Sequence, residues 1–214
     1  IAAFAAGRPV VVVDDADREN EGDLVYAAAL ATDAVTAFTV RHTSGVICTP
    51  MPADLADRLA LPPMTARNED PKGTAYTVSV DAATEVSTGI SAADRTRTLR
   101  VLADPAAEPA DLTRPGHVFP LRAVPGGVRV RRGHTEAGVE LCRLADVAPV
   151  AAIAELVHDD GTMMRLPALR EFADEHGLVL ISIEDLVRHL EEEGPTPVPV
   201  PAEATLPTRH GVFR

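Results

Sequence analysis

Short apolar runs alternate with amphipathic segments along most of the chain, a pattern that is typical of a mixed α/β protein. The apolar runs predict strands at residues 9–13, 24–29, 45–50, 75–80, 118–122, 127–131, 150–156 and 178–181. The amphipathic segments predict helices at residues 33–42, 52–60, 91–102, 135–145, 167–176 and 182–191. Two helix starts carry the S-x-x-D capping pattern, at Ser91 and Ser182, which supports these boundaries. Together the elements predict a single compact α/β (α+β) domain over residues 1–193.

The regular pattern ends at a proline-rich segment. Every second residue from Pro195 to Pro201 is proline, and this spacing holds the backbone extended. We therefore expect a linker at residues 194–203. Residues 204–214 are expected to be either a disordered tail or the start of a further unit.

The composition is that of a globular protein with a substantial core, because 46% of the 214 residues are hydrophobic and 24% are charged. The formal net charge of −12 repels nucleic acid, so nucleic-acid binding is not expected. No apolar stretch approaches the roughly 18 residues of a membrane span and no signal peptide is evident, so no membrane association is expected. Cys48 and Cys142 match no paired motif, which favours buried thiols in a reducing cytoplasm.

Six carboxylates and one arginine occupy the ten residues that follow the valine run Val10 to Val13. A continuous β-branched run predicts a strand buried on both faces, and α/β proteins bind ligands where such strands end. If the segment continues extended, Glu19, Glu21 and Asp23 project to one side at spacings of about 7 Å. Carboxylates that close need a cation, which either Arg18 or a hard divalent ion such as Mg²⁺ can supply. The alternative is a solvated acidic turn.

A second candidate site lies where a predicted strand gives way to a helix, around Arg131 to Thr135. Free N–H groups and the helix dipole favour an anion at such a helix start, where Thr135 adds a hydroxyl and Arg131 a fork of donors. This predicts a phosphate cradle. His134 beside it is a candidate metal ligand. The alternative is a capped helix that follows solvated arginines, with His134 in the core.

Two further polar residues stand in unusual settings. His117 lies in a turn held by proline and glycine that leads into a short strand, where an exposed, inactive histidine is the alternative. Glu155 lies within an apolar run, where burying an ionised carboxylate costs free energy unless it has a partner or a chemical role. An outward-facing strand residue is the alternative for Glu155.

Five segments, taken together and in order, closely resemble motifs of the 3,4-dihydroxy-2-butanone 4-phosphate synthase family of riboflavin biosynthesis. These segments are DDADRENEGD at 14–23, RHTSG at 41–45, STGISAADR at 87–95, RPGHVFPLR at 114–122 and RGHTEA at 132–137. The resemblance covers about residues 1–192 and implies the fold of that family, a mixed sheet flanked by helices. Residues 206–214 resemble the opening strand of GTP cyclohydrolase II, which many bacteria fuse after the synthase. Residues 204–214 would then begin a truncated second domain, too short for the zinc cysteines that its activity needs.

The resemblance implies a cytoplasmic lyase that converts D-ribulose 5-phosphate into L-3,4-dihydroxy-2-butanone 4-phosphate and formate. It implies two Mg²⁺ (or Mn²⁺) ions per site and a homodimer with active sites at the subunit interface. The implied metal ligands are Glu19 and His134. The implied phosphate-binding positions are Arg131 and Thr135, and the implied sugar contacts are Arg18 and Asp23.

The family also has an essential polar pair, which the resemblance places at His117 and Glu155, with the histidine supplied by the partner subunit. Loss of the C3 proton from a ketose requires a base and an electrophile that holds the resulting charge, and Mg²⁺ can supply the second. The candidates for the base are Glu21, Asp23, His117 and Glu155. We favour Glu155, which would also contact substrate, with His117 as the proton shuttle.

Three other functions compete with this one. A metal-dependent hydrolase would use the same carboxylates but would release no formate. A non-catalytic scaffold would be expected to lose site residues, and none are lost. A nucleic-acid module is disfavoured by the acidity of the chain.

The polar segment 67–73 is predicted to be a loop that orders over the substrate.

Overall fold

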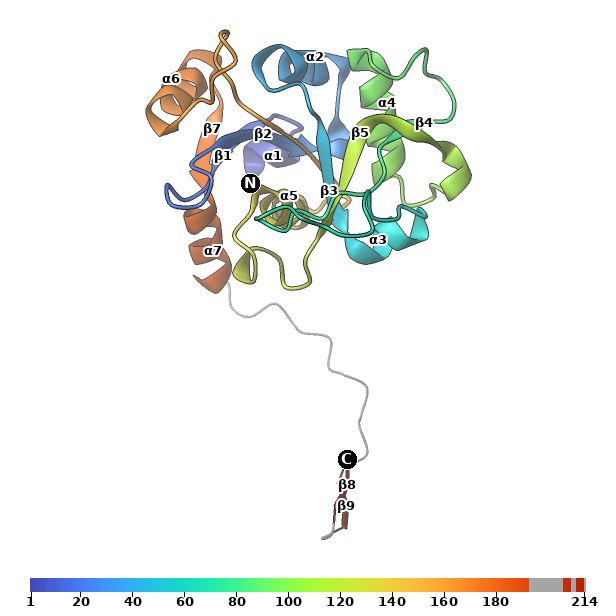
Figure 1. The fold of residues 1–214 in the computed structure, drawn as a ribbon. Coiled ribbons are helices and arrows are strands. Elements are labelled where there is room, and N and C mark those ends of the chain that lie inside the picture. The colour runs from blue at the N-terminus through green and yellow to red at the C-terminus, as the bar shows by residue number, and fades with distance from the viewer. Residues whose placement is uncertain (193–205, 209–210, 214) are drawn as a thin grey trace.

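The computed structural model describes residues 1–192, 206–208 and 211–213 (Figure 1). The strands of the main sheet are β1 (Val10–Val13), β2 (Gly22–Ala27), β3 (Cys48–Pro52), β4 (Val80–Ala82), β5 (Leu112–Ala123), β6 (Ala151–Glu155) and β7 (Val179–Ser182). The helices are α1 (Ala2–Ala5), α2 (Asp33–His42), α3 (Ala53–Arg58), α4 (Ala92–Ala103), α5 (His134–Leu144), α6 (Leu166–His176) and α7 (Ile183–Glu192). Short 3-10 turns are η1 (Ala28–Leu30), η2 (Pro109–Asp111) and η3 (Gly127–Arg129).

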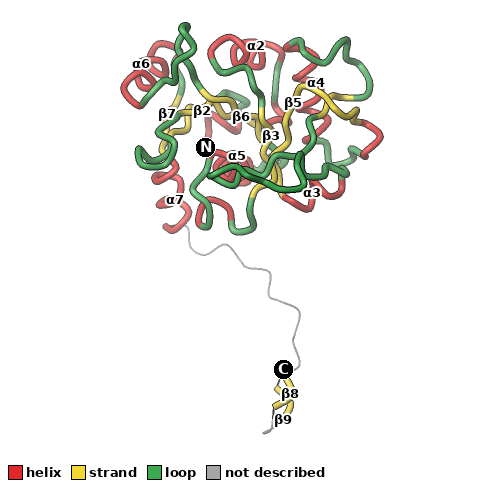
Figure 2. Tube along the Cα trace, viewed as in Figure 1, coloured by secondary structure: helices red, strands yellow, loops and turns green. Residues whose placement is uncertain are grey.

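The seven strands form one mixed sheet in the order β4-β5-β3-β6-β2-β1-β7. β1 pairs with β7 and β3 pairs with β5 in parallel, and the other neighbours are antiparallel. Figure 2 shows β6 between β2 and β3, near the middle of the sheet. The predicted α/β domain with a mixed sheet and flanking helices is confirmed.

Helices cover both faces of this sheet, with α2, α4 and α6 along the upper side of Figure 1 and α5 and α7 along the lower side. The valine run of β1 packs against helices on both faces of the sheet. Val10 and Val12 belong to the core cluster that α5 and α7 contribute to, whereas Val11 and Val13 pack with α6. Burial on both faces is therefore the physical reason for a run of four apolar residues, as the sequence predicts.

Both predicted capping serines act as expected. The Ser91 side chain accepts a hydrogen bond from the Asp94 backbone N–H at 3.0 Å, at the start of α4. The Ser182 side chain accepts from the Asp185 N–H at 3.0 Å, at the start of α7. Capping therefore helps to place these two helix starts within a residue of their predicted positions.

The strand predicted at residues 127–131 is wrong, because Gly127–Arg129 form the 3-10 turn η3. Gly126 and Gly127 have φ values of +92° and +59°, in the left-handed region, which a regular strand does not use. The strand predicted at 75–80 is mostly absent too. Tyr76 and Thr77 make single bridges, and β4 begins only at Val80.

β5 begins at Leu112, six residues before its predicted start at 118, and α1 was not predicted. The segment that opens β5 contains Pro115 and Gly116, which normally end strands, but β4 pairs with Leu112 and Thr113 before them and with Val118 after them, across an irregularity in the register. Because this pairing joins distant parts of the chain, local sequence does not reveal it.

Residues 206–208 and 211–213 form a separate antiparallel pair, β8 (Leu206–Thr208) and β9 (Gly211–Phe213). The predicted proline-rich linker at residues 194–203 lies outside the described residues. None of the helices in the described part of the chain combines the length and hydrophobicity needed to cross a membrane.

Candidate active site

The acidic loop between β1 and β2 is folded around the buried carboxylate of Asp14. This carboxylate accepts hydrogen bonds from the backbone N–H groups of Glu19 and Glu21, at 3.1 and 2.9 Å, and from Arg18 Nη1 at 2.9 Å. Asn20 has a φ of +56°, so the loop is not extended through this point as the alternation of carboxylates assumed. After this turn Glu19 lies near His134 at the start of α5. Glu21 directly precedes β2, and Asp23 lies in β2.

Asp14, Glu19 and His134 form a set of candidate cation ligands, with one ligand atom from each within 4.8 Å of the others. His134 Nε2 lies 3.1 Å from the Val12 carbonyl oxygen. A carbonyl can only accept, so Nε2 carries the proton and the Nδ1 lone pair faces Glu19, whose Oε2 is 3.9 Å away. Burial lowers the pKa of His134 and so favours the neutral imidazole that a metal requires.

Asp23 adds an unsatisfied oxygen beside this set. Its Oδ1 is buried without a hydrogen-bond partner among the described residues and lies 3.9 Å from His134 Nδ1. Burial raises the pKa of Asp23 well above its ordinary value, and the charge of Glu155, its neighbour across β2 and β6, adds to this shift. A buried carboxylate oxygen left without a donor fits a site that holds divalent cations.

Arg131 and Thr135 are the candidate anion-binding side of the site. Thr135 is buried in the first turn of α5, and Arg131 Nη2 lies 3.3 Å from Thr74 Oγ1. Arg131 Nη1 donates to the buried Glu136 carboxylate at 2.6 Å, which fixes the guanidinium. A Cβ on Gly133 would lie 2.4 Å from Arg131 Nη1 and 3.0 Å from Arg18 Nη2, so glycine there lets both guanidinium groups approach the helix start.

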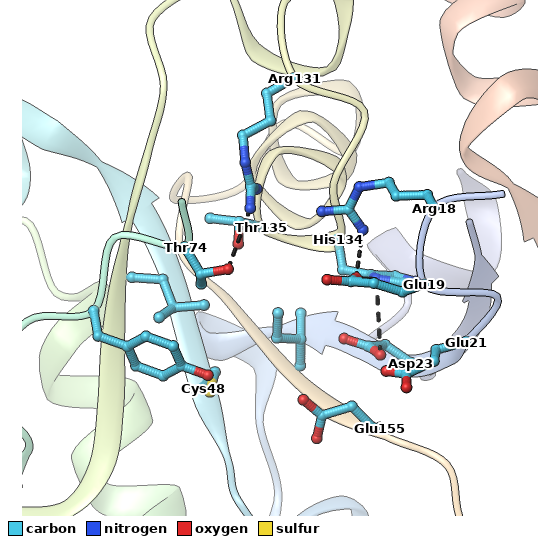
Figure 3. A pocket seen from close by; sticks show the side chains of 13 residues that line it. Arg18, Glu19, Glu21, Asp23, Cys48, Thr74, Arg131, His134, Thr135 and Glu155 are labelled. Atoms are coloured by element: carbon cyan, nitrogen blue, oxygen red, sulfur yellow. Dashed lines mark hydrogen bonds and ion pairs between the residues drawn. The ribbon is translucent and has the colours of Figure 1, made fainter. Parts of the chain in front are cut away.

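One cavity joins the cation and anion sides, and its side chains converge from β2, β6, α5 and the acidic loop (Figure 3). Eight of its lining residues were predicted from the sequence: Arg18, Glu19, Glu21, Asp23, Arg131, His134, Thr135 and Glu155. Five others were not: Cys48, Thr74, Tyr76, Leu121 and Ile153. Asp14 was also missed as part of the cation set, although its position directly after the valine run is a signal that could have found it.

Cys48 and Tyr76 also line this cavity, and no signal in the sequence sets them apart from core residues. Burial raises the pKa of Cys48 to about 12, so the thiol is inert as a nucleophile at neutral pH. The prediction of a buried, unpaired thiol is confirmed for both cysteines.

The predicted loop around residues 67–73 lies against the acidic loop. Lys72 Nζ donates to the Arg18 carbonyl oxygen at 2.8 Å, and Arg131 Nη2 donates to the Lys72 carbonyl oxygen at 3.3 Å. Thr74, which follows directly, lines the cavity. These contacts place the segment at the edge of the site, and its ordering by substrate stays a prediction.

His117 is the one predicted site residue that does not line this cavity. It lies on β5, four residues or roughly 13 Å of strand before the lining residue Leu121. Its Nδ1 is 2.7 Å from Asp81 Oδ2, and 42% of its side chain is exposed. His117 therefore lies apart from the cavity that the other predicted site residues line.

The fold and the cavity define a class of protein: an α/β enzyme in which acidic residues suited to divalent cations face a helix start suited to an anion. The chain belongs to the 3,4-dihydroxy-2-butanone 4-phosphate synthase family, whose sequence profile matches residues 1–189. The resemblance drawn from the sequence motifs is thereby confirmed.

Curated relatives carry the name riboflavin biosynthesis protein RibBA. The chain is 61% identical over 217 residues to RibBA of Salinispora arenicola, covering 100% of this chain and 51% of that protein. It is 55% identical over 223 residues to RibBA of Mycobacterium tuberculosis, again covering 100% of this chain and 51% of that protein. The chain therefore spans about half the length of the curated relatives it matches.

Solved structures agree in fold. A 3,4-dihydroxy-2-butanone 4-phosphate synthase solved in complex with two magnesium ions superposes with a TM-score of 0.87 at 51% identity, covering 91% of this chain and 96% of that chain. RibBX of A. baumannii, described as a two-domain synthase, gives a TM-score of 0.87 at 39% identity and covers 99% of this chain and 62% of that chain.

Proposed function

We propose that this chain converts D-ribulose 5-phosphate into L-3,4-dihydroxy-2-butanone 4-phosphate and formate, in the cytoplasm, as a step of riboflavin biosynthesis. The observation that carries the proposal is one cavity lined both by Glu19 and His134, two members of the cation set, and by Arg131 and Thr135. Such a cavity suits a substrate that has vicinal oxygens at one end and a phosphate at the other. Membership of the synthase family supports the same reaction.

Glu19 and His134 would hold the cations, two Mg²⁺ or Mn²⁺ ions per site, with Asp14 keeping the acidic loop in place around them. When bound, such ions stabilise negative charge that develops on the ketose oxygens. The neutral His134, the unsatisfied Asp23 oxygen and the density of carboxylates all fit that role.

Glu155 would take the first proton. It ends β6 beside Asp23 and lines the cavity, and its Oε2 accepts a hydrogen bond from Ser44 Oγ at 2.7 Å, which orients the carboxylate. Glu21 and Asp23, also in the cavity, are the other carboxylates that could carry protons between oxygens of the substrate. Arg18, Arg131 and Thr135 would hold the substrate by its sugar hydroxyls and phosphate.

The reaction is tested by measuring formate released from D-ribulose 5-phosphate with Mg²⁺ and again with excess EDTA. We expect formate to appear together with dihydroxybutanone phosphate, to stop with EDTA and to return when Mg²⁺ is restored, since Glu19 and His134 of the cation set line the cavity. Release of inorganic phosphate without formate would favour the hydrolase. No turnover by a folded chain would favour the scaffold.

Arg131→Ala is expected to raise the KM for D-ribulose 5-phosphate about 10- to 100-fold while lowering kcat less, because a phosphate contact is made equally in the ground and transition states. Steady-state kinetics give both constants. Arg132→Ala is the matched control, since Arg132 is the adjacent exposed arginine and does not line the cavity. Because Arg131 also neutralises Glu136, thermal melting of both variants separates lost binding from lost stability. A normal KM in Arg131→Ala would contradict the phosphate assignment.

We further propose a homodimer in which His117 of one subunit completes the site of the other. The support is that His117 lies outside the cavity of its own chain while sharing β5 with a lining residue.

Residues 194–203 and 204–214 are proposed as a linker and as the start of a cyclohydrolase II-like domain. The support for the latter is that the RibBA relatives are about twice as long as this chain.

Co-expression of two inactive variants tests the shared site. Differently tagged His117→Asn and Glu19→Gln chains are expected to regain activity when they are co-expressed. A dimer with one chain of each variant has one site in which both residues are intact. For random pairing this gives about a quarter of the wild-type formate rate per subunit. Each variant alone is the control. Mixed dimers that form but stay inactive would show that both residues act from the same chain.

A further inference from the structure

We propose that Asp81 is the positioning residue of His117: it fixes the imidazole with a proton on Nδ1 and leaves Nε2 as the atom that accepts and returns protons. This inference rests on the proposed function, because it takes His117 to act in the site of a second copy. Asp81 itself does not line the cavity. It would therefore act only through the histidine.

Asp81 holds His117 at two points. Asp81 Oδ2 lies 2.7 Å from His117 Nδ1, and Asp81 Oδ1 accepts a hydrogen bond from the His117 backbone N–H at 2.9 Å. Asp81 lies in β4 and is 7% exposed, whereas the histidine ring on β5 is open to solvent on one side. A carboxylate that binds both the backbone and the ring restrains the side-chain torsions and directs Nε2 outward.

The segment at residues 87–91 closes over this pair, although none of it lines the cavity. Gly89 has a φ of +93°, and a Cβ there would lie 2.1 Å from Asp81 Oδ2 and 2.7 Å from His117 Nδ1. The segment is held by Asp94, which accepts hydrogen bonds from Ser87 N, Ser87 Oγ and Gly89 N at 3.0, 2.7 and 3.0 Å. The Ser-Thr-Gly motif thus covers the Asp81 and His117 pair and leaves little room for water between them.

The two hydrogen bonds predict what an amide would do at this position. An aspartate accepts from both donors of His117, whereas an asparagine has one accepting oxygen and one donating NH₂ group. The backbone N–H of His117 cannot become an acceptor, so the asparagine oxygen must face it. The NH₂ group then faces Nδ1, which must lose its proton, and the proton moves to Nε2. Asp81→Asn therefore keeps the shape of the pair but turns Nε2 from an acceptor into a donor.

A purely structural role makes a different prediction. Asp81 lies where the pairing of β4 with β5 changes register, between Val80 and Asp81, and the contact with His117 could serve only to join the two strands. In that case Asp81→Asn would change stability but not the tautomer of His117, and its effect on kcat would be independent of the histidine. The experiment below measures these quantities separately.

The test combines histidine-labelled ¹⁵N NMR with kinetics of the full chain and its variants. In the wild type, the His117 ring, assigned by its absence from His117→Asn, should show a protonated Nδ1 and an unprotonated Nε2. Asp81→Asn should reverse this pattern and lower kcat about 100- to 10,000-fold, with the KM for D-ribulose 5-phosphate within about threefold of the wild type. The double variant Asp81→Asn/His117→Asn should be no slower than His117→Asn alone.

Three results would overturn the proposal: a wild-type His117 protonated on Nε2, a kcat of Asp81→Asn within about threefold of the wild type, or additive losses in the double variant. The wild-type spectrum needs no variant of Asp81, so the tautomer can be decided even if Asp81→Asn does not fold. Formate release by the wild type separately tests the proposed function. If it fails, the NMR assignment alone still decides whether Asp81 fixes the ring.

Discussion

Replacing Glu19 by glutamine is expected to lower the Mg²⁺-dependent formate rate at least about 100-fold at a Mg²⁺ concentration that saturates the wild type. The change removes one of the two proposed protein ligands together with its negative charge. It also releases Arg18, which forms ion pairs with both Asp14 and Glu19, so the acidic loop loses part of its internal pairing. A Mg²⁺ titration of the formate rate, and direct Mn²⁺ binding followed by electron paramagnetic resonance, measure the effect.

Asp17→Asn is the matched control for this prediction. Asp17 lies two residues away in the same loop and carries the same charge, but it is exposed and does not line the cavity. We expect its Mg²⁺ dependence to stay within about twofold of the wild type, because exposed charges are screened. Equal losses in both variants would mean that total loop charge, and not a ligand at Glu19, sets the metal affinity.

Replacing Gly116 by alanine is expected to destabilise the fold by about 3 kcal/mol or more, which lowers the Tm of a domain of this size by roughly 6–12 °C. A Cβ at this position would lie 2.0 Å from the Val80 carbonyl carbon and 2.2 Å from the Asp81 backbone nitrogen. Both atoms are backbone of β4, so relief requires that β4 and β5 separate. Thermal and urea unfolding followed by circular dichroism measure the loss.

Gly161→Ala separates this clash from the conformational cost of replacing glycine. Gly161 has a φ of +84° but nothing within 4 Å of an added Cβ, so its cost is expected to be only about 1 kcal/mol. A Gly116→Ala variant that unfolds at the same temperature as Gly161→Ala would show that β4 and β5 tolerate the extra atom. The close approach would then not explain why glycine precedes His117.

The sequence predicted those helices best whose ends are marked by local chemistry. α2 was predicted at its observed bounds of Asp33–His42, where Thr32 caps the first turn by accepting from the Val35 N–H. The strand predicted at residues 127–131 was wrong because the local pattern there is misleading. Their alternation of apolar and polar residues satisfies a strand, but two left-handed glycines turn the backbone before α5.

The residues of the cavity were likewise predictable only where a local motif groups them. The sequence identified eight residues that line the cavity, seven because the acidic run and the helix start each bring polar groups together within a few residues, and Glu155 because it interrupts an apolar run. It did not find Thr74, Tyr76 or Cys48, which come from other parts of the chain and have no local signal of a site. It also treated the acidic run as extended, whereas the hydrogen bonds to Asp14 fold it into a loop.

The sequence by itself determined the α/β class, the valine strand, the capped helices, the two polar motifs and the family resemblance. Each of these depends on neighbours within one element, where backbone geometry and period alone dictate which side chains share a face. Only the tertiary structure decided that His134 faces Glu19 with Nδ1 and that His117 lies outside its own cavity beside Asp81. These depend on the order of strands in the sheet, and that order is set by packing between distant segments, which no local pattern encodes.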